Sequence, residues 1–153
     1  MSTASDIART KGIAVSKIFR VSVLVVLVSI AANLAARALA FALLDLPVDF
    51  PPLAPAAIVI VTLLGTSMAG LAFSIVVRRA RNPIATYRVV ALIALVVSIL
   101  PNFGLMANPT AAPFPGGTAQ AFGVLIVFHV IAAAISVGLL TTLTRSAGKT
   151  VRD

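Results

Sequence analysis

The chain contains 153 residues, of which 60% are hydrophobic and only 10% are charged, and its formal net charge is +8. A soluble domain carries about 25% charged residues, so this composition, with a mean hydropathy of +1.12, excludes the soluble globular class. Cysteine is absent, which excludes disulfides and metal sites built on cysteine.

Four apolar runs dominate the chain, and each has the length, about 20 residues, that a helix needs to cross a hydrocarbon core about 30 Å thick. They cover 18–44, 55–77, 84–107 and 119–144. None alternates apolar and polar residues as the strands of a transmembrane barrel do, and an open sheet cannot satisfy its backbone groups in lipid. We therefore predict an all-α integral membrane protein, a four-helix bundle with up-down-up-down topology formed by residues 18–144.

The basic residues identify the cytoplasmic side of this bundle. Lysines and arginines precede the first run, flank the turn between the second and third, and follow the fourth, while the loops at 45–54 and 108–118 contain none. This asymmetry is typical of the positive-inside rule. It predicts a multi-pass protein of a bacterial plasma (inner) membrane, with both tails, 1–17 and 145–153, in the cytoplasm. Anionic headgroups of the bilayer would bind the basic rim, which accounts for the net charge without a nucleic-acid partner.

The first run carries two polar residues in its outer half. Asn33 and Arg37 are four positions apart and therefore share one face of a helix. Ala38-Leu39-Ala40 also fits a signal-peptidase site, so cleavage is an alternative to a retained span. The run is longer than the apolar region of a signal peptide, which has about 7–15 residues, and Arg37 directly precedes the cut, which favours retention.

Proline and capping residues mark the helix ends. Pro55 suits the first turn of the second helix, where a missing N–H costs nothing. Asn82 followed by Pro83 has the pattern of an N-cap and a first helical residue, and Thr118 is a candidate N-cap for the fourth helix.

The second run contains two pairs of small residues at a spacing of four, Gly65 with Ala69 and Gly70 with Ser74. Such pairs let helix backbones approach closely in a membrane. We predict that this face packs against neighbouring spans. Small-residue faces would also allow a homo-oligomer or a place in a larger membrane complex.

Polar side chains from all four spans fall at similar depths in the outer half of the membrane. Counted from the outer end of each span at 1.5 Å per residue, the depths are about 8–18 Å. Because polar groups that face hydrocarbon are costly, this coincidence predicts a ligand-binding pocket. The candidate ligand-binding residues are Asn33, Arg37, Thr62, Thr66, Ser98, Asn102 and His129, with Asp45 and Asp49 of the first loop as candidate counter-ions.

The sequence leaves two orientations of Arg37 open. The guanidinium group can reach toward the outer headgroups, because it lies away from the membrane centre, where an arginine costs about 2.5–3.5 kcal/mol on insertion scales. Alternatively, it faces the bundle interior with Asn33, Asn102 and His129 and lines a cavity open to the outside. In that case, Arg37→Ala and His129→Ala would abolish stabilisation of the protein by a ligand.

His129 is the only histidine in the chain. A lone histidine on an apolar helix is usually a hydrogen-bonded interior group; the functional alternatives are a bond to a ligand carbonyl, such as that of a quinone, or a proton relay. Haem ligation by two histidines would need a dimer. A metal site would need a second histidine or a carboxylate inside a span. We predict no metal, no cofactor and no catalytic residue, since Ser67 and His129 form a hydrolytic pair only if their helices face each other.

Three features carry a resemblance to known sequences: the overall length, the Asn33 and Arg37 pair, and the segment Phe128-His129-Val130-Ile131-Ala132-Ala133-Ala134. In these features the chain resembles an uncharacterised family of small bacterial four-span membrane proteins, of the domain-of-unknown-function type. The resemblance implies a four-span architecture and supplies no catalytic roles.

The sequence therefore favours a non-enzymatic function. The leading hypothesis is a membrane protein that binds, or helps to move, a small amphipathic or anionic molecule in an outward-facing polar pocket. The first alternative is an accessory or assembly subunit of a membrane complex, in which the polar groups only join the helices. The second is a quinone- or redox-linked membrane component that uses His129.

Overall fold

The computed structural model describes residues 15–144, and within this range every long element is an α-helix. The elements are α2 (Val15–Leu43), η1 (Pro51–Leu53), α3 (Pro55–Arg79), α4 (Pro83–Ala107), η2 (Pro109–Ala111) and α5 (Ala119–Leu143), where η denotes a short 3-10 helix. The described residues contain no strand. The predicted all-α fold is confirmed, and each long helix covers one predicted apolar run. The predicted tails, 1–17 and 145–153, lie outside the described residues, except that α2 begins at Val15, inside the first tail.

Local chemistry explains where these helices begin. Pro55 and Pro83 each occupy the first position of a helix, as predicted, because proline has no N–H to lose there. Thr118 is the N-cap of α5, and its hydroxyl accepts a 3.2 Å hydrogen bond from the backbone N–H of Ala121. Asn82 precedes α4 as predicted, but its side chain makes no capping bond.

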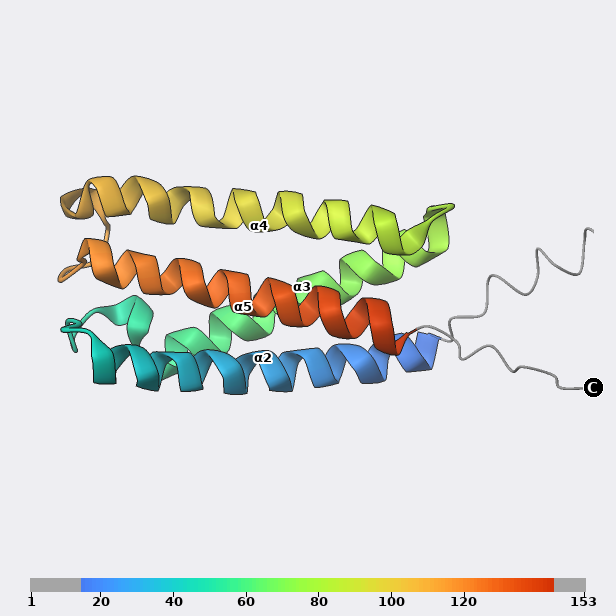
Figure 1. Ribbon diagram of the computed structural model, residues 1–153, viewed down its shortest axis with the longest axis horizontal. Helices are drawn as coiled ribbons and strands as arrows, with labels where there is room; N and C mark the ends of the chain where they lie inside the picture. Colours follow the sequence, from blue (N-terminus) through green and yellow to red (C-terminus); the bar gives the residue numbers. More distant parts are fainter. Residues whose placement is uncertain (1–14, 145–153) are drawn as a thin grey trace, which may run out of the picture.

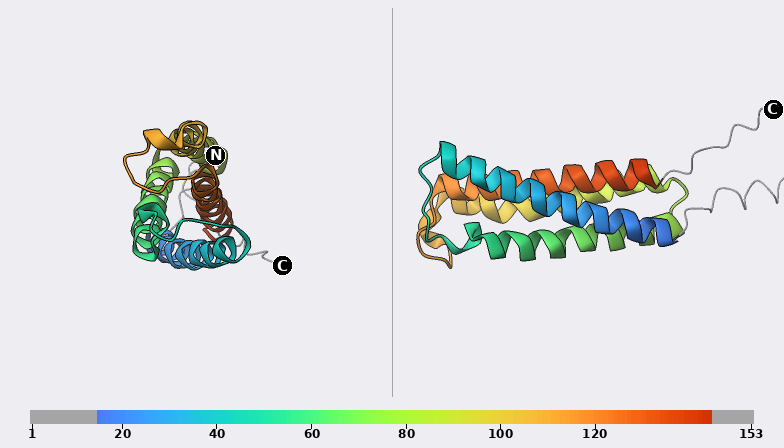
Figure 2. Two further views of the ribbon diagram at one scale, coloured as in Figure 1. Left: turned by 90° about the vertical axis from the view of Figure 1, so that its left-hand side faces the viewer. Right: turned by 90° about the horizontal axis from the view of Figure 1, so that it is seen from below.

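The four helices lie side by side around a common axis (Figure 2), in the order α2, α3, α4, α5. The connections 44–54 and 108–118 lie at one end of the bundle, here called the long-loop end (Figure 1). The turn at 80–82 lies at the other, the short-turn end, with the first turn of α2 and the last turn of α5. From the short turn, α3 and α4 diverge toward the long-loop end, where α3 lies nearer α2. Neighbouring helices share extensive contacts except α3 and α4, whose seam is the loosest.

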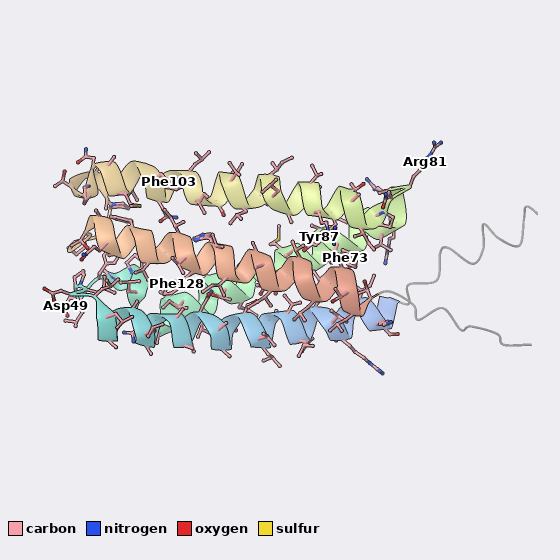
Figure 3. The ribbon with its side chains drawn as sticks, viewed as in Figure 1. Asp49, Phe73, Arg81, Tyr87, Phe103 and Phe128 are labelled. Atoms are coloured by element: carbon pink, nitrogen blue, oxygen red, sulfur yellow. The ribbon has the colours of Figure 1, made fainter. Side chains whose placement is uncertain are left out.

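Two apolar clusters close the ends of the bundle. The long-loop cluster is built by Phe50 and Leu53 from the first loop with Phe122 and Phe128 of α5. The short-turn cluster includes Phe73 of α3, and Phe73 and Tyr87 meet edge to face, with ring centroids 4.9 Å apart; Figure 3 shows this pair and Phe128 at different levels of the bundle. Between the clusters lies a layer of buried polar side chains, namely Ser29, Asn33, Thr62, Thr66 and Ser136.

The outer surface of the bundle is apolar. Each of the four long helices is long and apolar enough to cross a membrane, and large side chains such as Leu27, Leu64 and Leu92 are each 61% exposed. Contiguous apolar surface of this extent is unfavourable in water, whereas hydrocarbon solvates it. The four helices thus indicate a multi-pass membrane protein.

Candidate functional site

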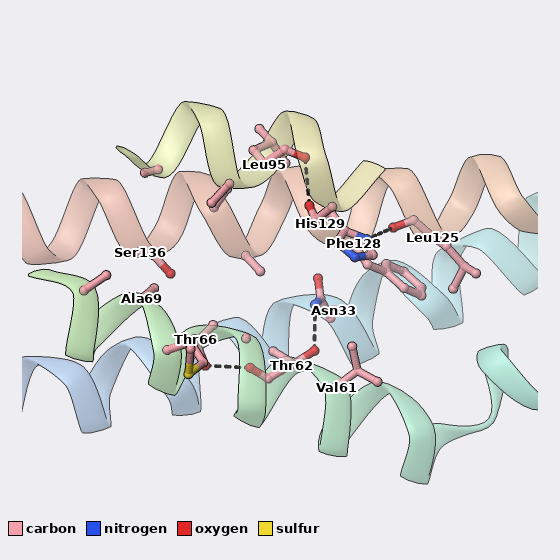
Figure 4. Close-up of a pocket in the computed structure, with 18 of the residues that line it drawn as sticks. Asn33, Val61, Thr62, Thr66, Ala69, Leu95, Leu125, Phe128, His129 and Ser136 are labelled. Carbon is pink, nitrogen blue, oxygen red and sulfur yellow. Dashed lines mark hydrogen bonds between the residues drawn. The ribbon is translucent and has the colours of Figure 1, made fainter. Parts of the chain in front are cut away.

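A cavity of about 540 Å³ lies between α3, α4 and α5, with Asn33 of α2 in its wall. Figure 4 shows residues that line it, with Asn33 and Thr62 opposite Phe128 and His129. The volume falls within the range of about 300–1,000 Å³ that is usual for small-molecule sites. The cavity is therefore the strongest candidate for a functional site in the part of the chain that the structure describes.

The cavity exists because small residues from three helices face one another where α3 and α4 diverge. Gly65, Ala69, Ala94 and Ala133 all line it. A Cβ atom added to Gly65 would have no neighbour within 4 Å, so this glycine does not bring two backbones together. The predicted packing role of the pair Gly65 and Ala69 thus differs from what is observed: these two residues make space.

The cavity opens sideways, between α3 and α4. Its exposed lining residues all belong to these two helices; Val61 is 58% exposed and Met68 is 65% exposed on α3, and Val90 is also exposed on α4. On α5, by contrast, Phe128 and Ser136 are buried. The loose seam between α3 and α4 therefore forms the mouth.

Both ends of the cavity are closed. Ile58 and Phe128 line it and also belong to the apolar cluster at the long-loop end. Tyr87 lines it at the short-turn end and is 1% exposed. This geometry differs from the outward-facing pocket expected from the sequence, because the first loop folds over the bundle and seals that end with Phe50 and Leu53.

A buried amide lies in the cavity wall. The Nδ2 of Asn33 donates a 3.0 Å hydrogen bond to the hydroxyl oxygen of Thr62, and the Thr66 hydroxyl donates a 2.6 Å bond to the Thr62 carbonyl. The Oδ1 of Asn33 is buried and has no hydrogen-bond partner, although the residue is only 2% exposed. In Figure 4 this oxygen points across the cavity toward α5. An unpaired buried acceptor costs about 1–3 kcal/mol, so a donor placed in the cavity would be bound favourably.

His129 contributes a second acceptor. Its Nδ1 lies 2.7 Å from the Leu125 carbonyl oxygen of the same helix (Figure 4). Because a carbonyl can only accept, Nδ1 carries the hydrogen, and Nε2 of the neutral ring keeps a free lone pair. His129 lines the cavity and is half-buried. The ring is thus both a hydrogen-bonded interior group and a potential ligand contact.

Two further candidates on α4 have different positions. Ser98 lines the cavity, and its hydroxyl donates a 2.8 Å bond to the Leu95 carbonyl. Asn102 is buried but does not line the cavity; its Nδ2 lies 3.4 Å from the Ser98 carbonyl oxygen. The structure therefore brings together Asn33, Thr62, Thr66, Ser98 and His129 of the predicted site and leaves Asn102 outside it.

Arg37 lies outside the cavity. Its Nε donates a 2.7 Å hydrogen bond to the Leu53 carbonyl of η1, and its guanidinium carbon lies 4.4 Å from the centre of the Phe41 ring. The side chain is half-buried, and Arg37 is not among the residues that line the cavity. Asp45 and Asp49 are exposed, and within the described residues neither pairs with it. The hydrogen bond of Arg37 to Leu53 therefore connects the first loop to α2.

Replacing Arg37 with alanine is expected to destabilise the protein by about 1.5–3 kcal/mol, because the Leu53 carbonyl loses a charged donor. The measurement is unfolding of the purified protein in mixed detergent micelles, followed by circular dichroism. Arg88→Ala, which removes an exposed arginine of α4, serves as the control and should change the stability little. Equal effects of the two substitutions would contradict a fastening role for Arg37.

Sequence reasoning missed Tyr87 as a cavity residue. Its hydroxyl is buried and has no hydrogen-bond partner, as is also true of the Ser29 hydroxyl on α2. Tyr87 is the only tyrosine in the chain, and its place one turn after the basic 80–82 turn is typical of an interfacial anchor. Nothing in its local sequence indicates that the side chain points inward.

No group of three or more His, Cys, Asp or Glu side chains that could hold a metal occurs between residues 15 and 144. Comparison of the whole chain with protein-family models, with curated proteins and with solved structures gives no match.

Proposed function

We propose that this chain is a non-enzymatic membrane protein that binds a small amphipathic molecule in the cavity between α3, α4 and α5. One observation carries the proposal: a closed-ended apolar cavity, open only toward the flanks of two apolar helices, contains a buried amide oxygen without a partner. An apolar wall with a few placed polar groups is the usual design of a small-molecule site.

The proposed orientation has up-down-up-down topology with both termini in the cytoplasm of a bacterial-type plasma membrane. Its support is the charge distribution. The short-turn end carries Arg78, Arg79 and Arg81, whereas the connection at 44–54 carries Asp45 and Asp49 and no basic residue; Arg81 and Asp49 lie at opposite ends in Figure 3. The positive-inside rule places the basic end in the cytoplasm, where it would bind anionic headgroups.

The cavity favours an amphipathic ligand over an anion. Its lining includes no lysine or arginine, since Arg37 is bound to Leu53 outside it. An anion buried without a cation is strongly disfavoured. A ligand with an apolar body and one uncharged polar group matches the lining instead.

The mouth gives this ligand a route from the bilayer. Val61, Met68 and Val90 at the edge of the cavity are exposed on helices that would face hydrocarbon. A molecule already dissolved in the membrane can therefore enter between α3 and α4 without crossing the long-loop cluster. Transport would need a second opening, so we restrict the proposed function to binding.

The test uses 4-nonylphenol, an apolar molecule with one polar group, titrated into the purified protein in detergent micelles. Native mass spectrometry measures the fraction of protein in a one-to-one complex. We expect saturable binding to the unaltered protein and a loss of affinity of about tenfold or more in Gly65→Leu. The leucine meets no neighbour at Cβ and would occupy the mouth.

Gly138→Leu is the matched control for this test. Gly138 is exposed on α5, does not line the cavity, and has no atom within 4 Å of an added Cβ. This variant should bind like the unaltered protein. Ala133→Leu fills the cavity from the opposite wall and should reproduce the effect of Gly65→Leu. Binding that is absent from the unaltered protein, or unaffected by both filling substitutions, would overturn the proposed function.

Other expectations stay predictions. They are membership of the uncharacterised four-span family, an accessory or assembly role in a larger complex, self-association, and a quinone-linked role for His129. An accessory role and self-association make no use of the cavity, whereas a quinone-linked role would use the same site.

A further inference from the structure

We infer that the cavity selects ligands whose polar group donates a hydrogen bond, an alcohol or phenol in preference to an ether, ester or ketone. The inference rests on the proposed function and adds the chemical class of the ligand. It follows from the unpaired buried acceptor in the cavity wall, the Oδ1 of Asn33, and from the side chains near it whose hydrogens are already used.

Three side chains that line the cavity direct a hydrogen to a protein acceptor, whereas the Thr62 hydroxyl accepts from Asn33 and its own hydrogen has no acceptor among the described residues. The Thr66 hydroxyl hydrogen is used by the Thr62 carbonyl at 2.6 Å, and the Ser98 hydroxyl hydrogen by the Leu95 carbonyl at 2.8 Å. The N–H of His129 is directed at the Leu125 carbonyl. Each of these three side chains can offer a ligand only a lone pair.

Asn33 determines that a donor is preferred over an acceptor as the polar group of the ligand. Its Oδ1 is an acceptor without a partner and is 2% exposed, so neither bulk solvent nor lipid reaches it freely. A ligand hydroxyl supplies the missing donor. An ether or ketone oxygen in the same place would face Oδ1 and the Nε2 of His129 with lone pairs opposed, and the acceptor would stay unpaired.

The remaining length of the cavity fits an apolar tail. On α4 the lining extends from Ser98 back to Tyr87, a distance of about 16 Å at 1.5 Å per residue. Between them the wall is formed by small side chains, among them Ala69, Ala91 and Ala94. The hydroxyl group therefore lies at the Asn33 level and the tail extends along these small side chains.

Two probes with the same ring and the same tail test this inference on the unaltered protein. They are 4-nonylphenol and 4-nonylanisole, in which a methyl ether replaces the hydroxyl group. Native mass spectrometry of the protein in micelles, at equal probe-to-detergent ratios, gives both dissociation constants. We expect the phenol to bind about tenfold more tightly.

Asn33→Leu tests whether the preference for the phenol comes from the Oδ1 of Asn33, because leucine has a similar volume and no acceptor. The phenol should lose its advantage, so that the two dissociation constants become equal. Asn102→Leu is the matched control: it removes the other buried asparagine, which lies outside the cavity, and should leave the tenfold ratio intact.

The outcomes separate the inference from the proposed function. Equal affinity for both probes in the unaltered protein, or tighter binding of the anisole, would overturn the selection of donors while leaving a binding cavity. A ratio that survives Asn33→Leu would overturn the assignment to Oδ1. Binding of neither probe would overturn the proposed function itself. The probe comparison needs no variant, so a failure of Asn33→Leu to fold does not prevent the decision.

Discussion

Replacing Phe50 with alanine is expected to lower the free energy of unfolding by about 3–5 kcal/mol, the usual cost of truncating a fully buried phenylalanine. Phe50 is 1% exposed and meets Phe122 edge to face, with ring centroids 5.3 Å apart. The contact joins the first loop to α5. Its loss would open the long-loop end of the bundle.

Gly117 makes the Phe50 site intolerant of rearrangement. A Cβ added to Gly117 would lie 3.0 Å from the Phe122 ring and 3.4 Å from the Phe50 ring. The backbone of the second loop therefore already lies close to both rings, and the Phe122 ring limits how far it can move inward to fill the space that alanine leaves. The free-energy cost of the substitution includes a term that increases with the volume of the cavity left behind, and that volume is larger where the surroundings cannot relax.

The measurement for Phe50→Ala is unfolding in mixed detergent micelles followed by circular dichroism, with Phe114→Ala as the control. Phe114 lies in the second loop and is 46% exposed, so its truncation should cost about 0.5 kcal/mol or less. A similar small effect at Phe50 would show that the first loop does not seal the bundle in solution.

Gly70→Ala is expected to destabilise the protein although alanine is the better helix former. An added Cβ would lie 2.6 Å from the Ser22 Oγ and 3.0 Å from the Ser22 Cβ. Rotation of the Ser22 side chain can relieve the contact with Oγ, but the contact with Cβ requires α2 and α3 to move slightly apart, at a cost of about 1–3 kcal/mol. The gain in helix propensity is at most about 1 kcal/mol, so the overlap should dominate.

A double-mutant cycle in the same unfolding assay isolates the contact. Ser22→Gly in the Gly70→Ala background removes both overlapping atoms and should restore most of the lost stability. Gly104→Ala is the matched control, because no atom lies within 4 Å of its added Cβ; it should leave stability unchanged or raise it. If Gly70→Ala behaves like Gly104→Ala, the close approach of α2 to α3 at this level is wrong.

The sequence alone identified the depth of the polar residues along each helix. Rise per residue converts position directly into depth, and Asn33, Thr62, Thr66 and His129 do meet at one level of the bundle. The helix starts at Pro55, Pro83 and Thr118 were equally readable, because capping is local chemistry.

The direction of each side chain was not readable, and the two glycines of α3 show why. Gly65 and Gly70 are five residues apart, which rotates them by about 140° around a helix of 3.6 residues per turn. One faces the cavity and the other faces Ser22 of α2. Their small-residue spacings look alike in sequence, and only the positions of the neighbouring helices decide which pair makes a contact and which makes a space.

Composition and periodicity determined that this chain forms four apolar helices with a polar layer in the bundle, because the length of each apolar run, the helix rise and the helix-end signals are properties of the chain itself. The tertiary structure alone decided that Arg37 binds the Leu53 carbonyl, outside the cavity that Asn33 lines. The two residues share a helix face but differ in depth by about 6 Å. At the level of Arg37 the folded first loop supplies the partner, and a contact between segments that are distant in sequence follows from packing of the whole bundle.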